Sequence, residues 1–175
     1  MSQAWPSTRA SVKLAFTAVM SALIAVTTMM AIPMPPPLST ITLAPIAIFT
    51  TAILMGPWIG LVATAIGSGL GFLAGVSIGT VVVLPAFLYV FFWGIIIARA
   101  PMGLGVGLLR KTSELAAMIA GVLIETVIFF VADWYLFGFA GALITLGTLV
   151  DLVYVPITYG ILEGLRRALN IKHLV

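Results

Sequence analysis

The sequence predicts an all-α, polytopic membrane protein with six transmembrane helices and both termini in the cytoplasm. The first observation is composition: of 175 residues, 62% are hydrophobic and 7% are charged, whereas a soluble domain carries about 25% charged residues. The second is that no charged residue or histidine lies between Lys13 and Arg99. The third is that the basic residues form three clusters, at the front, in the middle (Arg99, Arg110 and Lys111) and at the end of the chain. Because cytoplasmic loops are rich in Lys and Arg, these clusters set the predicted orientation.

Breaks in the apolar pattern define the individual helices. A transmembrane helix needs about 20 apolar residues, and Pro- or Gly-containing segments interrupt the uncharged stretch at 32–37, 56–57 and 75–79, where helices end. A later stretch, 112–165, has room for two crossings with a turn at 133–141. The second span is short, and we expect it to be tilted or partly loop. One domain, 1–175, is therefore predicted with spans near 13–32, 41–55, 58–75, 79–98, 112–133 and 141–165.

Two predicted helices carry small residues at four-residue spacing. Ala18 and Ala22 lie on the first helix, and Ala63, Gly67 and Gly71 lie on the third. Residues four apart share a helix face, and small ones let another helix approach closely within the membrane. The pattern fits packing inside the bundle, and it also fits a docking surface for a separate membrane subunit.

Two acids are predicted to lie deep in the membrane. Glu125 lies about 12 Å from the outer end of its helix, and Asp151 lies about 15 Å into the last span. Ionisable groups at such depth usually mark a binding site or a transport pathway. The alternative is a structural role, with hydrogen bonds to neighbouring hydroxyl groups such as those of Thr126 and Thr148.

Aromatic residues occur near these acids. Phe129 and Tyr154 each share a helix face with one of the two acids, and Tyr89 and Trp93 lie four apart on the fourth span. Aromatic residues at this spacing are often packing residues or interfacial anchors. Beside buried acids they also fit a pocket for a flat, polar, ring-containing solute.

The chain lacks the residues that several classes of function require. The chain has no cysteine, which excludes disulfides and thiol catalysis. The glycine-rich segment 67–71 does not continue into a phosphate-binding motif, and the single histidine, His173, lies in the tail. We therefore expect no catalytic residues, no metal site, no cofactor and no nucleic-acid partner.

With these features the chain resembles the S component, or substrate-binding subunit, of energy-coupling factor (ECF) vitamin transporters. The resemblance rests on size, topology, Ala18-x-x-x-Ala22, the segment Ile-Thr-Leu-Ala-Pro at 41–45 and the turn Gly-Pro-Trp-Ile-Gly at 56–60. Asp151 followed by basic residues also matches the family pattern. Many relatives carry a lysine soon after this acid, whereas here the chain continues Leu-Val-Tyr, so the substrate is left open.

The resemblance implies a multi-pass protein of the cell membrane that captures a vitamin or related micronutrient on the outer side. The pocket would use helices four to six, closed by a lid at 33–40 that includes Thr40. The partners would be the lipid bilayer, a transmembrane coupling subunit and two ABC ATPases. Two alternatives remain: a stand-alone secondary transporter that uses Glu125 or Asp151 as a proton site, and an intramembrane enzyme acting on lipids. The expected substrate-binding residues are Thr40, Tyr89, Trp93, Glu125, Phe129, Asp151 and Tyr154.

Overall fold

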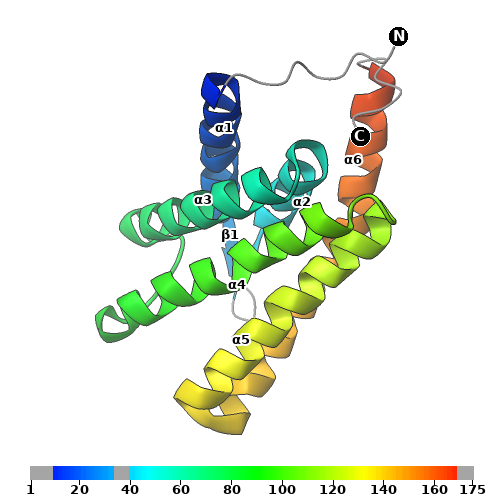
Figure 1. Ribbon diagram of the computed structural model, residues 1–175. Coiled ribbons are helices and arrows are strands. Elements are labelled where there is room, and N and C mark those ends of the chain that lie inside the picture. The colour runs from blue at the N-terminus through cyan, green and yellow to red at the C-terminus, as the bar shows by residue number, and fades with distance from the viewer. Residues whose placement is uncertain (1–9, 34–39, 169–175) are drawn as a thin grey trace.

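The computed structural model describes residues 10–33 and 40–168, which are almost entirely helical, as predicted for an all-α membrane protein. Figure 1 shows the helices crossing one another, with the start of α1 and the end of α6 both at the top of the view. The elements in chain order are α1 Ala10–Met29, β1 Ala31–Pro33, β2 Thr40–Thr42, α2 Ala44–Met55, α3 Pro57–Ile78, η1 Pro85–Phe87, α4 Leu88–Leu109, α5 Glu114–Thr145, η2 Leu146–Val153 and α6 Tyr154–Ala168.

Four helical stretches in the described residues are long and apolar enough to cross a membrane. They are α1, α3, η1 with α4, and the continuous run 114–168, while α2 is a shorter apolar helix. The run 114–168 folds into two legs at Gly138, whose φ of 76° and ψ of 179° are not helical. This break lies inside the predicted turn at 133–141. Six crossings and cytoplasmic termini remain predictions.

The two legs are joined by hydroxyl groups. Thr145 donates a hydrogen bond to the Asp133 carboxylate close to the turn. Farther along, the Thr126 and Thr148 hydroxyls are 2.8 Å apart and hydrogen-bonded. The second leg therefore lies against the first, which brings η2 beside the middle of α5.

A short antiparallel hairpin, which the sequence did not predict, connects α1 to α2. Strands β1 and β2 pair with Ile32 opposite Ile41 and with Thr42 opposite Ala31. Most of the predicted lid, 34–39, lies outside the described residues. Strand β2 reaches η2, so the described end of the lid segment lies next to the last crossing.

The turn between α2 and α3 packs against the end of α4. Gly56 adopts a φ of 92°, which glycine accepts without strain, and Pro57 begins α3. A Cβ on Gly107 would lie 2.4 Å from the Cα of Pro57. Arg110 Nη1 also donates to the Ile53 carbonyl at 2.7 Å. These contacts bring the α2–α3 turn and the α4–α5 connection to the same end of the molecule.

The predicted fourth span, 79–98, is wrong at both ends. Gly79 ends α3 in a left-handed conformation, and α4 begins only at Leu88 and continues to Leu109. Arg99 was expected at the membrane surface but lies inside this helix, and Pro101 follows it without ending the helix. The prediction ended this span just before the charge of Arg99, although a charge stays within a bundle when it is paired.

The last predicted span, 141–165, is also not one regular helix. Its first part is the end of α5 and the 3₁₀ segment η2, and α6 begins only at Tyr154. Pro156 lies in the first turn of α6, where its missing N–H is tolerated. A regular helix running through this point would need that N–H to bond the carbonyl four residues earlier, so the proline favours a new start here.

The small residues of α3 lie in an internal helix contact with α1. A Cβ on Gly67 would lie 2.6 Å from the Ser21 carbonyl oxygen, and one on Gly71 would lie 2.5 Å from that of Ala25. Ala63 is fully buried as well. The structure therefore places these three residues in packing within the chain, the first of the two roles that their spacing allowed. Ala18 and Ala22 lie on the exposed face of α1.

Candidate functional site

An arginine, two acids and a threonine lie close together inside the bundle. Arg99 comes from α4, Glu125 from α5, Asp151 from η2 and Thr42 from the end of β2. None of the four residues is more than 9% exposed. The return of the second leg at Gly138 brings Asp151 beside α5. The site thus joins the three predicted pocket helices to the segment that follows the predicted lid.

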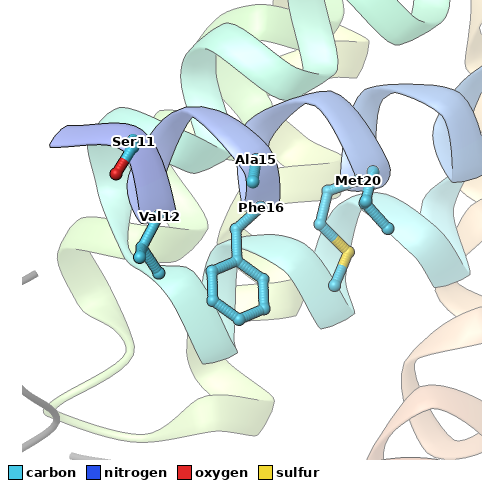
Figure 2. A pocket seen from close by; sticks show the side chains of 6 residues that line it. Ser11, Val12, Ala15, Phe16 and Met20 are labelled. Carbon is cyan, nitrogen blue, oxygen red and sulfur yellow. The ribbon is translucent and has the colours of Figure 1, made fainter. Parts of the chain in front are cut away.

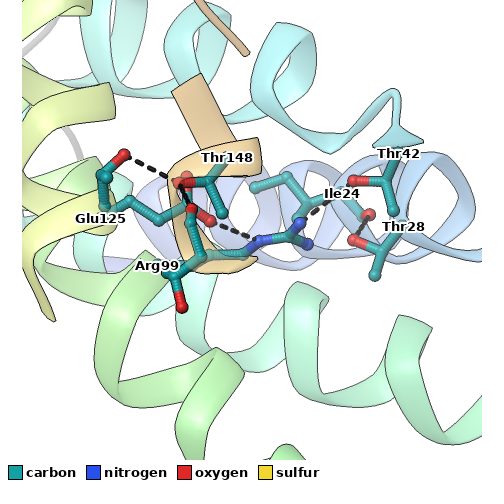
Figure 3. Close-up of polar contacts among 8 residues, drawn as sticks. Ile24, Thr28, Thr42, Arg99, Glu125 and Thr148 are labelled. Atoms are coloured by element: carbon teal, nitrogen blue, oxygen red, sulfur yellow. Dashed lines mark hydrogen bonds and ion pairs between the residues drawn. The ribbon is translucent and has the colours of Figure 1, made fainter. Parts of the chain in front are cut away.

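Arg99 joins Glu125 and Thr42 through two hydrogen bonds (Figure 3). Its Nε donates to Glu125 Oε1 at 3.0 Å, and its Nη2 donates to Thr42 Oγ1 at 3.0 Å. Asp151 lies near enough to interact electrostatically with both Glu125 and Arg99. A buried charge is tolerated when it is paired and hydrogen-bonded, so Arg99 and Glu125 stabilise each other's position.

Several polar atoms of the cluster have no protein partner in the part of the chain described. Arg99 Nη1 and Glu125 Oε2 are buried without a hydrogen bond, and the Asp151 carboxylate has no hydrogen bond to another described residue. Buried polar groups in folded proteins are nearly always bonded to protein, water or ligand. One donor and at least one acceptor are therefore available to a bound molecule or to water.

The neighbouring hydroxyls do not satisfy the acids. Thr126 and Thr148 bond to each other at 2.8 Å, and Thr148 also donates to the Thr145 carbonyl at 2.8 Å. The structural role considered for Glu125 and Asp151, hydrogen-bonding to these threonines, is thus not what the structure shows. With two carboxylates and one guanidinium, the cluster has more acidic than basic groups.

The predicted aromatic residues divide into two groups. Tyr154 is 8% exposed and lies one turn after Asp151, while Phe129 is half-buried one turn after Glu125. Tyr89 is 75% exposed and Trp93 is 57% exposed, so they do not join the buried acids. Outward-facing rings of this kind fit the alternative of lipid or interfacial contacts. The Thr40 backbone lies in β2 opposite Pro33.

Arg99 is a member of the candidate site that the sequence did not predict. It was grouped with Arg110 and Lys111 as one cytoplasmic cluster. It precedes that pair by about three helical turns, with apolar residues and glycines between. That spacing was the available signal, because a surface arginine is not usually separated from its loop by such a stretch.

A separate apolar groove lies along the first half of α1 (Figure 2). All of its lining residues belong to α1, and all but one of them are apolar. Nothing in it resembles the polar cluster of the bundle interior. The lining residues are Ser11, Val12, Ala15, Phe16, Val19 and Met20.

Comparison with protein families identifies the family of this chain. A family model described as the S component of an ECF-type riboflavin transporter matches residues 9–165. No curated protein and no solved structure matches the chain. The matched residues include every member of the buried cluster and the whole of α1.

Proposed function

The chain belongs to the family of ECF-type riboflavin transporter S components, and from this premise we propose that it captures a vitamin at the outer face of the cell membrane for import. Riboflavin is the first candidate substrate, because it is the one named in the description of the family. The observation that carries the proposal is the buried cluster of Arg99, Glu125 and Asp151, which retains unpartnered polar atoms. Such atoms in a largely apolar bundle are what a binding site for a small polar solute requires.

We propose that the chain works with a coupling module made of a transmembrane subunit and two ABC ATPases. The sequence contains no Walker motif, so energy from ATP must come from other chains. The docking face we propose is on α1, where Ala18 and Ala22 lie exposed. Only 17% of the apolar window of α1 is buried, the smallest share among the four candidate spans in the described residues. This supports α1 as the helix that a partner covers.

We also propose six crossings with both termini in the cytoplasm. Arg110 joins the α4–α5 connection to the end of α2, and Arg166 pairs with Glu114 across the start of α5 and the end of α6. These contacts keep several basic residues at one end of the bundle. The positive-inside tendency favours the cytoplasm for that end.

Binding to the purified chain tests the proposal directly. Flavin fluorescence, titrated with the chain in detergent, should fall to saturation at one riboflavin per chain. Thiamin and biotin serve as competitors. Neither thiamin nor biotin is expected to displace riboflavin. Binding of another vitamin in place of riboflavin would change the substrate but keep the transporter role, whereas no binding of any vitamin would contradict it.

Uptake measurements distinguish the proposed role from a stand-alone secondary transporter. Vesicles containing the chain with its coupling module should accumulate riboflavin only when ATP is supplied. Vesicles containing the chain alone should not accumulate it under a proton gradient. Accumulation by the chain alone would favour the proton-coupled alternative, for which the buried acids would be the proton site.

A further inference from the structure

We propose that Arg99 and Glu125 bind an uncharged edge of the substrate in which a carbonyl oxygen and an N–H lie next to each other, as in a ring imide or amide. This inference rests on the proposed function, since it assigns atoms within the same site. It concerns which chemical groups of the substrate the cluster binds, and the family match does not give this.

The free atoms of the ion pair define the required ligand groups. Arg99 uses Nε on Glu125 and Nη2 on Thr42, which leaves Nη1 as a buried donor without a partner. Glu125 uses Oε1 on Arg99, which leaves Oε2 as a buried acceptor without a partner. A ligand that satisfies both must present an acceptor to the guanidinium and a donor to the carboxylate. An imide edge offers both within a few ångströms.

The charges of the cluster argue against a charged ligand group. Glu125 and Asp151 together outnumber Arg99, so a carboxylate or phosphate would lie beside two acids in a low-dielectric interior, where repulsion between like charges is strong. A cationic group would suit the two acids but would leave Arg99 Nη1 unsatisfied and would be repelled by that guanidinium. A neutral group that both donates and accepts satisfies Arg99 and Glu125, and it leaves Asp151 as a second acceptor for another donor of the ligand.

Riboflavin and its N3-methyl analogue provide the ligand side of the test. The ring of riboflavin carries an N–H between two carbonyls, and methylation at N3 removes only the donor. Loss of one hydrogen bond to a charged group weakens binding roughly 10- to 150-fold. The wild-type chain should therefore bind the N3-methyl analogue weaker than riboflavin by a factor in this range.

The protein side of the test removes both members of the ion pair. The double variant Arg99→Met with Glu125→Met removes both charges of the ion pair, a replacement that folded proteins often tolerate. It should bind riboflavin roughly 10- to 150-fold weaker and should no longer distinguish riboflavin from the N3-methyl analogue. The matched control is Glu114→Met with Arg166→Met, which removes another ion pair whose Glu114 Oε2 is also buried without a partner. This control should keep both the affinity and the discrimination.

The outcomes separate this inference from the proposed function. Equal binding of both flavins by the wild type, or unchanged riboflavin affinity in a folded double variant, would overturn the inference and leave the transporter role intact. Absence of riboflavin binding by the wild type would overturn the proposed substrate and the inference together. If the double variant does not fold, the comparison of the two flavins on the wild type still decides.

Discussion

Arg99 Nε and Glu125 Oε1 lie 3.0 Å apart, although the residues come from two helices and lie 26 positions apart in the sequence. The pair is buried, with side-chain exposures of 11% and 2%. Removing one partner of a buried ion pair leaves an uncompensated charge, whereas replacing both with apolar residues often does not destabilise a protein. The stability of the fold with either charge buried therefore depends on the presence of the other charge.

Single replacements in this pair should together destabilise the fold more than the double replacement. Arg99→Met or Glu125→Met alone should lower the free energy of unfolding by about 3–5 kcal/mol, while the double variant should lose less stability than the sum of the two single variants. Denaturant unfolding in detergent, followed by tryptophan fluorescence, measures this. Additive effects of the two single variants would show that the side chains are not coupled.

Much of the helical framework follows from the sequence, and the departures have local causes. The turn at Gly138 and the short second helix follow from glycine, proline and apolar length. The fourth helix does not, because helix ends were placed at the first charge, Arg99. The tertiary contact with Glu125 makes that charge acceptable inside a helix. A contact between residues so far apart cannot be predicted from a single sequence.

The candidate site was likewise only partly predictable. Glu125 and Asp151 were identified from their depth alone, since a charge far from any helix end must face protein or water. Their partner Arg99 and the contact from Thr42 depend on how distant segments pack. Tyr89 and Trp93 were placed at the site from helical spacing, which gives a shared face but does not say whether that face is inside.

Close packing between α1 and α3 predicts a difference between two glycines. A Cβ at position 71 would lie 2.5 Å from the Ala25 carbonyl oxygen, whereas one at position 94 would meet nothing within 4 Å. Gly71→Ala should therefore lower stability by about 1–3 kcal/mol. Gly94→Ala, also within a helix, should be neutral or slightly stabilising. Thermal unfolding of both variants in detergent checks this, and equal midpoints would contradict the close contact.

Reporter fusions test the proposed topology. Reporters at residues 37, 77 and 137 should read outside, and a reporter at residue 112 should read inside, because α4 ends at Leu109 and α5 begins at Glu114. One reversed position would contradict a model of six crossings.

Asp151→Asn should weaken substrate binding without loss of the fold. Asp151 is 7% exposed, and an amide keeps its volume while leaving Arg99 and Glu125 as a balanced pair. Loss of a hydrogen bond between this charged group and the ligand should weaken binding roughly 10- to 150-fold. Calorimetry with riboflavin would measure this change in affinity.

The control for Asp151→Asn is Asp133→Asn, at an acid that accepts a hydrogen bond from Thr145 near the turn. Its riboflavin affinity should equal that of the wild type. If Asp151→Asn keeps wild-type affinity but unfolds at a lower temperature, the acid has a structural role only.

A larger side chain on the exposed face of α1 should separate substrate binding from transport. Ala22 is exposed on this helix, so Ala22→Leu adds bulk without entering the bundle and should leave riboflavin binding by the isolated chain unchanged. If a coupling subunit packs closely on Ala18 and Ala22, the added side chain prevents that approach. Co-purification with the coupling module and ATP-dependent uptake should then both be lost. Ala140→Leu, at another exposed position near the turn of α5, should retain both. Equal loss of riboflavin binding and uptake in Ala22→Leu would instead assign Ala22 to the packing of the chain itself.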